Sequence, residues 1–171
     1  LGEMLIMTNK IKVLIADEPT MQMRFKQLFE VENEAIIVGL AATAEETIQK
    51  AKALQPDIVL LDLNLPDMDG FAATEILSVE VPFSGIILMG SRSGHEDLRK
   101  AMLAGAKDYI VKPFPSEELF NAINQVYAST KRMRVDAKKV GDGKVITVFS
   151  PRGGVGKTVL STNLGVALAA I

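Results

Sequence analysis

The sequence predicts an α/β fold built on a doubly wound parallel sheet. Short β-rich apolar runs end in polar residues and alternate with segments of helical period, which is typical of parallel rather than antiparallel sheets. The chain has 171 residues, of which 48% are hydrophobic and 23% charged, an ordinary globular composition. This length suits one domain of usual size and part of another.

Five strand–helix units can be assigned in order along the chain. Thr43 and Glu46 have the spacing of a capping box, Ser116 before two glutamates suits a helix start, and Gly105 fits a left-handed helix stop. We predict strands at residues 11–16, 35–41, 57–62, 85–90 and 108–112, and helices at 20–29, 44–54, 70–79, 95–104 and 116–129.

A sixth strand, KVITVFS, opens a new unit after a charged, glycine-containing segment. It leads into the loop PRGGVGKT and a last predicted helix, so we expect the start of an incomplete second α/β domain cut from a longer protein. The chain begins with Leu1 rather than Met, and we interpret the opening residues as a tag or disordered start. The predicted divisions are 1–9 for this start, 10–130 for the first domain, 131–143 for a linker and 144–171 for the second domain.

Charge and composition restrict the classes of function. Residues 1–130 hold 11 basic and 19 acidic residues, whereas residues 131–171 hold 8 and 2, so the first part suits a cation and the second an anion or phosphate. The basic run from residue 131 to 144 lacks aromatic residues, and we interpret it as a linker without a nucleic-acid partner.

Cysteine and histidine usage excludes several kinds of site. There is no Cys, which excludes disulfides and thiolate metal sites, and the single histidine, His95, excludes sites built from several imidazoles. We expect His95 to be exposed near a helix start. No apolar run reaches the roughly 18 residues of a membrane helix, so the expected location is the cytoplasm.

Acidic residues follow two of the predicted strands. Asp17 and Glu18 follow the first strand, Asp62 ends the third and Lys112 ends the fifth. Carboxyl ends of parallel strands converge on one edge of a sheet, where clustered carboxylates suit Mg²⁺. An Asp62 oxygen would then be able to attack a phosphoryl group, and Lys112 would balance its charge. The alternatives are loop caps and a surface lysine. An EF-hand is excluded because Pro66 would be a ligand and Asp67 would replace the required Gly.

The segments VLIADEP, VLLDLNLPDMDG, IILMGS and GAKDYIVKPF together resemble the response-regulator receiver domain of two-component signalling. The resemblance covers about residues 10–130 and implies a flavodoxin-like strand order 2-1-3-4-5. It implies Asp62 as phosphoacceptor, Asp17 and Glu18 as metal ligands, Asn64 as a backbone-carbonyl ligand and Lys112 as phosphate partner. It also implies a cis bond before Pro113, and a receiver that catalyses its own phosphoryl transfer and dephosphorylation.

One position departs from the receiver pattern. The family has Ser or Thr at the end of the fourth strand, where its hydroxyl moves toward the phosphoryl group and transmits a switch. That position is Gly90 here. Ser91 is adjacent but would need a backbone shift, because neighbouring residues on a strand point to opposite faces. The aromatic residue that follows this switch is present as Tyr109.

The segment VITVFSPRGGVGKTVLSTNLGVALA has the strand, glycine-rich loop and helix order of a phosphate loop. It resembles the KGGVGKT loop of MinD/ParA-like ATPases, although Arg152 replaces the first lysine and Pro151 the usual first glycine. ATP binding is expected only in the intact parent protein, and this chain is not expected to hydrolyse ATP. The nucleotide-binding residues would be Arg152, Gly153, Gly154, Gly156, Lys157 and Thr158.

A receiver followed by a MinD/ParA-like ATPase resembles the CpaE/TadZ family of Flp/Tad pilus assembly. This resemblance implies a module phosphorylated on Asp62 that regulates the linked ATPase. Its implied partners are a sensor histidine kinase, pilus-assembly or polar-localisation proteins and a second copy of the chain, with recruitment to the inner membrane face or cell pole. The alternative is a pseudo-receiver that acts as a docking or dimerisation platform without phosphorylation.

Overall fold

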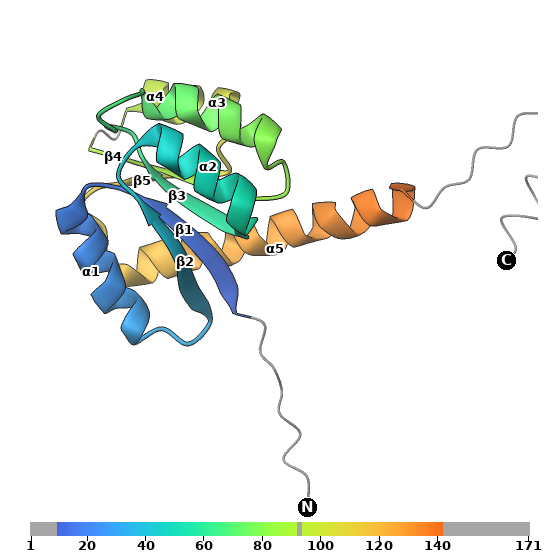
Figure 1. The fold of residues 1–171 in the computed structure, drawn as a ribbon, viewed down its shortest axis with the longest axis horizontal. Coiled ribbons are helices and arrows are strands. Elements are labelled where there is room, and N and C mark those ends of the chain that lie inside the picture. The colour runs from blue at the N-terminus through green and yellow to red at the C-terminus, as the bar shows by residue number, and fades with distance from the viewer. Residues whose placement is uncertain (1–9, 92–93, 142–171) are drawn as a thin grey trace, which may run out of the picture. The chain divides into compact units, whose positions relative to one another are not determined.

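The computed structural model describes residues 10–91 and 94–141, with side chains placed through residue 134. The predicted sixth strand, phosphate loop and last helix lie outside these residues. Within them, strands and helices alternate along the chain (Figure 1): β1 Ile11–Ala16, α1 Pro19–Glu30, β2 Ala35–Ala41, α2 Ala44–Leu54, β3 Ile58–Asp62, α3 Gly70–Glu80, β4 Gly85–Gly90, α4 His95–Ala104, β5 Asp108–Val111 and α5 Ser116–Gly141.

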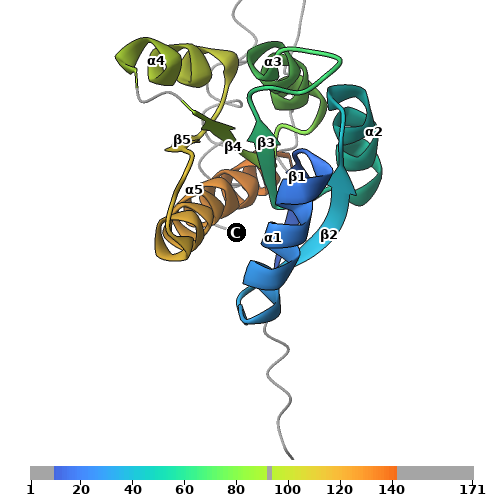
Figure 2. The same cartoon turned by 90° about the vertical axis from the view of Figure 1, so that its left-hand side faces the viewer.

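The strands form one parallel sheet in the order β2-β1-β3-β4-β5, which confirms the predicted flavodoxin-like topology. Helices α1 and α5 cover one face and α2, α3 and α4 the other (Figures 1 and 2). The order reverses between β1 and β3, because the chain winds outward first to one side and then to the other. This reversal brings the carboxyl ends of β1 and β3 side by side, with Ala16 paired to Leu61.

Alternating side chains of the central strands enter two separate cores. In β1, Val13 and Ile15 belong to the core beneath α1 and α5, whereas Leu14 belongs to the core beneath α2, α3 and α4. The same alternation holds in β3 and β4, whose residues are buried on both faces. Continuous apolar strands are therefore explained by a sheet that is covered on both sides.

The helix ends confirm most of the predicted capping. The Glu46 amide donates to the Thr43 hydroxyl at 3.1 Å, and Gly105 ends α4 with a φ of 104°. The other half of the capping box differs, because the Glu46 carboxylate accepts from the Ala42 amide rather than from Thr43. Helices α2 and α4 have their predicted bounds.

Helix α5 continues twelve residues beyond its predicted end at residue 129, through most of the segment predicted as a linker. Its buried positions continue with helical period through Val126 to Thr130. Gly85 makes this packing possible, since a Cβ there would lie 2.3 Å from a Val126 methyl group. The Lys, Arg, Met and Ala residues that follow are good helix formers. None of the described helices has the length and apolarity to cross a bilayer.

Candidate functional site

Two aspartates and a lysine meet at the carboxyl edge of the sheet. The Lys112 ammonium lies 2.6 Å from Asp17 Oδ2 and 3.0 Å from Asp62 Oδ1. The Asp17 side chain is 1% exposed, that of Asp62 13% and that of Lys112 21%. Each residue comes directly from the end of a central or edge strand, so the sheet itself fixes their positions. The sequence predicted this meeting of strand ends.

Burial has the largest influence on the pKa of the Asp17 carboxyl. Burial raises the pKa of the Asp17 carboxyl above its usual value, whereas hydrogen bonding and attraction from Lys112 act to lower it, and the Asp62 charge adds to the rise. The Asp17 carboxylate also accepts the Glu18 amide at 2.8 Å. Two buried carboxyl groups thus share the ammonium of Lys112.

The other two predicted metal-binding residues do not join this cluster through their side chains. Glu18 is exposed at the start of α1, where it makes no side-chain cap, and Asn64 is exposed in the loop after β3. Over residues 10–91 and 94–141, no group of three or more acidic, His or Cys side chains is placed to hold a metal. Asp17 and Asp62 nevertheless fit Mg²⁺, which is commonly held by one or two carboxylates and keeps several waters.

The loop after Asp62 is closed at its base. Asn64 and Asp69 form an antiparallel bridge, and the Gly70 amide donates to the Leu63 carbonyl at 3.0 Å. A Cβ on Gly70 would lie 2.7 Å from the Leu63 Cα, so this closure requires glycine. Asn64 is therefore held within a short loop that begins two residues after Asp62.

The tip of the same loop is attached to another element through Asp67. Its Oδ1 accepts the Ala44 amide at 2.7 Å and its Oδ2 accepts the Glu45 amide at 3.0 Å, both at the start of α2. The two backbone donors lower the Asp67 pKa, with Glu45 the larger cause. Our sequence interpretation missed this role, because Asp67 and Ala44 are separated by 23 residues and no local pattern links them.

Residues 13–124 match the family described as "Response regulator receiver domain", and this range includes the acidic cluster, Lys112 and the closed loop. The chain belongs to this family. The matched residues make up well over half of its length, and the phosphate-loop segment lies beyond them.

Three similar proteins illustrate the relationship. The chain is 38% identical over 117 residues to the nitrate/nitrite response regulator protein NarL of Escherichia coli K12, which covers 68% of this chain and 54% of that protein. It is 35% identical over 117 residues to the chemotaxis protein CheY of Thermotoga maritima, covering 67% and 96%. The structure of the CheX-CheY-BeF3-Mg complex from Borrelia burgdorferi gives a TM-score of 0.64 at 27% identity, covering 68% and 89%. The chain thus spans about half the length of the first of these relatives.

The space beside Gly90, the predicted switch position, is filled by a neighbouring ring. Gly90 is buried at the end of β4, and a Cβ there would lie 2.1 Å from the Tyr109 hydroxyl oxygen and 2.9 Å from the ring carbon that bears it. Leu88 and Tyr109 are paired across β4 and β5. Ser91 is exposed beyond the strand. Tyr109 therefore lies in space that any side chain at position 90 would need.

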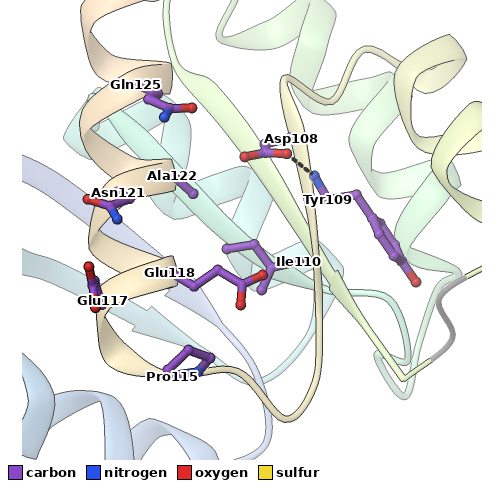
Figure 3. Close-up of a pocket in the computed structure, with 9 residues that line it drawn as sticks. All are labelled: Asp108, Tyr109, Ile110, Pro115, Glu117, Glu118, Asn121, Ala122 and Gln125. Carbon is purple, nitrogen blue, oxygen red and sulfur yellow. Dashed lines mark hydrogen bonds between the residues drawn. The ribbon is translucent and has the colours of Figure 1, made fainter.

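Two hollows flank the receiver domain near β5. The first, of about 380 Å³, lies between β5 and α5; Figure 3 shows that the Tyr109 ring points away from the α5 residues that line it. The second, of about 460 Å³, lies beside the acidic site and is lined by Met21, Arg24, Phe25, Gln27, Leu28, Lys112, Pro113 and Phe114. The peptide bond before Pro113 is cis, as the resemblance implied. His95 is exposed at the start of α4, as expected.

Proposed function

We propose that this receiver domain accepts a phosphoryl group on Asp62. The observation that carries the proposal is the position of Lys112, whose ammonium bridges the buried Asp17 and Asp62 carboxylates at 2.6 and 3.0 Å. A cation held between two carboxylates can transfer one of its contacts to an incoming phosphoryl oxygen without leaving the site. The CheY structure with BeF3 and Mg in its complex supports this assignment by relationship.

The chemistry follows from the residues. An Asp62 carboxylate oxygen attacks phosphorus, the bond from phosphorus to the donor breaks, and the donor leaves with the electron pair of that bond. Lys112 then pairs with a phosphoryl oxygen, which balances the added negative charge. Asp17, Asp62 and the Asn64 backbone carbonyl would hold Mg²⁺, with Glu18 able to reach it through water. When bound, Mg²⁺ supplies charge neutralisation for the transferred group.

The proposed donor is the phosphohistidine of a sensor kinase. The 460 Å³ hollow includes Lys112 and the apolar side chains Phe25 and Phe114, so a partner seated there would lie beside the acceptor. We propose further that phosphorylation regulates a linked MinD/ParA-like ATPase, in the manner of the CpaE/TadZ family, at the cytoplasmic face of the membrane or cell pole. The sequence PRGGVGKT supports this second step.

A second function is favoured by Gly90. The position lacks the hydroxyl that transmits the receiver switch, and Tyr109 already occupies the adjoining space. A receiver without this coupling would act as a docking or dimerisation platform whose surface is the same with or without a phosphoryl group. The two functions differ in one respect, because only the first requires Asp62 to be modified.

Incubation with acetyl phosphate tests the proposal. With Mg²⁺, intact-protein mass spectrometry should show the added mass of one phosphoryl group, and Asp62→Asn should show none. Asp57→Asn is the matched control, because Asp57 precedes the same strand at its opposite end and should leave labelling intact. Failure to label the folded wild-type chain would contradict phosphoacceptor function and favour the docking platform.

A further inference from the structure

The contact between Asp67 and α2 is the starting point for an inference about the acceptor loop. Asp67 is exposed and belongs to the loop between β3 and α3, yet both of its carboxylate oxygens accept amides from the first turn of α2. Backbone donors at a helix N-terminus, together with the helix dipole, stabilise a carboxylate. The contact therefore joins the acceptor loop to a separate element.

Helix α2 already has caps of its own. Thr43 accepts the Glu46 amide, and the Glu46 side chain accepts the Ala42 amide. Asp67 takes the two remaining donors named above, on Ala44 and Glu45. Because the Thr43 hydroxyl and the Asp67 carboxylate accept from different amides, the stability of α2 and the attachment of the loop can be separated by mutation.

The loop has its base and its tip fixed in different ways. The bridge between Asn64 and Asp69 and the bond from Gly70 to Leu63 close the base, within the chain segment itself. Asp67 lies between these points and provides the attachment to α2. The loop is thus fixed both at its base and at its tip.

We propose that Asp67 is a positioning residue for the acceptor site: it holds the loop against α2 so that the Asn64 carbonyl faces the Mg²⁺ held by Asp17 and Asp62. This inference rests on the proposed function. Asp67 acts through the backbone of its loop and does not touch the phosphoryl group. Residues that orient the ligands of a metal typically change metal affinity by about 10-fold or more when removed.

The test compares three variants of the full chain by amide NMR. Asp67→Ala removes the loop attachment. Thr43→Ala weakens the same helix end but keeps both amides that Asp67 accepts, and Glu45→Gln removes a neighbouring exposed charge. Mg²⁺ titration should show affinity reduced about 10-fold in Asp67→Ala, with changes below about twofold in both controls. Hydrogen exchange should be faster at the loop amides of residues 64, 65 and 67–69 in Asp67→Ala only.

Each other outcome has a distinct meaning. Equal loss of affinity in Asp67→Ala and Thr43→Ala would overturn the inference in favour of helix stability, and equal loss in Glu45→Gln would overturn it in favour of charge alone. Faster loop exchange with unchanged affinity would also overturn it, while leaving the phosphoacceptor proposal intact. Absence of Mg²⁺ binding by the wild-type chain would instead contradict the proposed function itself.

Discussion

The two ends of β3 each carry an aspartate paired with a cation, and the two pairs differ in how completely they are satisfied. Asp62 ends the strand and shares the Lys112 ammonium with Asp17. Asp57 precedes the strand; its Oδ1 accepts from Arg134 at 2.8 Å and its Oδ2 accepts the Lys12 amide at 2.9 Å. At one end the Lys112 ammonium is shared by two carboxylates, whereas at the other end each oxygen of Asp57 has its own donor.

The two cations also differ in the number and geometry of their hydrogen-bond donors. The Arg134 guanidinium donates to Asp57 and also, through Nε and Nη2, to the Phe83 carbonyl at 3.0 and 2.7 Å. A planar fork with several fixed donors suits permanent attachment, whereas an ammonium is a point charge that can exchange partners. The Asp57 end therefore anchors α5 to the sheet, whereas the Asp62 end, where one ammonium is shared, is the end that we propose receives a ligand.

Removal of Lys112 should lower the free energy of unfolding more than any other change considered below. Lys112→Ala leaves two buried carboxylates without a cation, and loss of one partner of a buried pair destabilises by about 3 kcal/mol or more. Urea unfolding without Mg²⁺ should show this loss, and Mg²⁺ should restore part of it by replacing the missing positive charge. A variant as stable as wild type in metal-free buffer would show that the charges at this end are not coupled.

Removal of Arg134 should cost less and leave the chemistry intact. Arg134→Ala loses hydrogen bonds to Asp57 and to the Phe83 carbonyl, with an expected loss of about 2 kcal/mol. Arg134→Lys should recover only part of this, because an ammonium cannot reproduce the fork. Labelling by acetyl phosphate should match wild type in both variants. Lost labelling in the folded Arg134→Ala protein would remove the distinction between an anchoring end and a reactive end.

A side chain at position 90 should displace Tyr109. Gly90→Thr introduces a Cβ into the space of the Tyr109 hydroxyl, and the overpacking should cost about 1 kcal/mol as the ring moves outward. The chain has no Trp and only two Tyr, so in a Tyr127→Phe background tyrosine fluorescence reports Tyr109 alone. Quenching by acrylamide should rise in Gly90→Thr. An unchanged signal would mean that the β4 backbone moves instead.

Loss of the half-exposed Glu46–Lys50 pair should have the smallest effect on stability, and it provides a baseline for the other two pairs. Its atoms are 2.7 Å apart, and hydrogen bonding to Lys50, aided by the Ala42 amide, lowers the Glu46 pKa. Because the folded-state pKa of Glu46 is lowered, the ionised carboxylate stabilises the fold above the usual glutamate pKa. This stabilisation is lost as the pH falls from that value through the lowered folded-state pKa. Glu46→Gln should therefore cost about 0.5 kcal/mol at neutral pH. A cost that stays constant from pH 7 to pH 3 would contradict this assignment.

Hydrophobic period was sufficient to place the strands, and the meeting of Asp17, Asp62 and Lys112 followed because a parallel sheet gathers strand ends at one edge. The strand order was implied by the resemblance to receiver domains. The sequence was insufficient for the Arg134 anchor. That residue lies in a basic run that resembles a solvated linker, and its carbonyl partner Phe83 is 51 positions away. Only the packing of α5 on the sheet brings them together.

The loop between β3 and α3 likewise contains features that the sequence predicted and contacts that it did not. The helix that begins at Gly70 was predicted from its local pattern, but the attachment of Asp67 to α2 depends on the arrangement of two crossover units. At Gly90 the sequence predicted only that a hydroxyl is missing. That the Tyr109 side chain fills the adjoining space depends on the packing of β5 beside β4. Local patterns thus predicted elements and strand ends, and contacts across elements determined how the site is held.

The most direct test of the central claim is an amide NMR titration of the full chain with Mg²⁺ and then beryllofluoride, in wild type and in Asp62→Asn. We predict saturable shifts at Asp62, Asn64 and Lys112 in wild type, loss of the beryllofluoride step in Asp62→Asn, and little change at Asp57 and Arg134 in either. Absence of a saturable response in wild type, or an identical response in Asp62→Asn, would contradict the assignment of this end of the sheet as a phosphoryl acceptor.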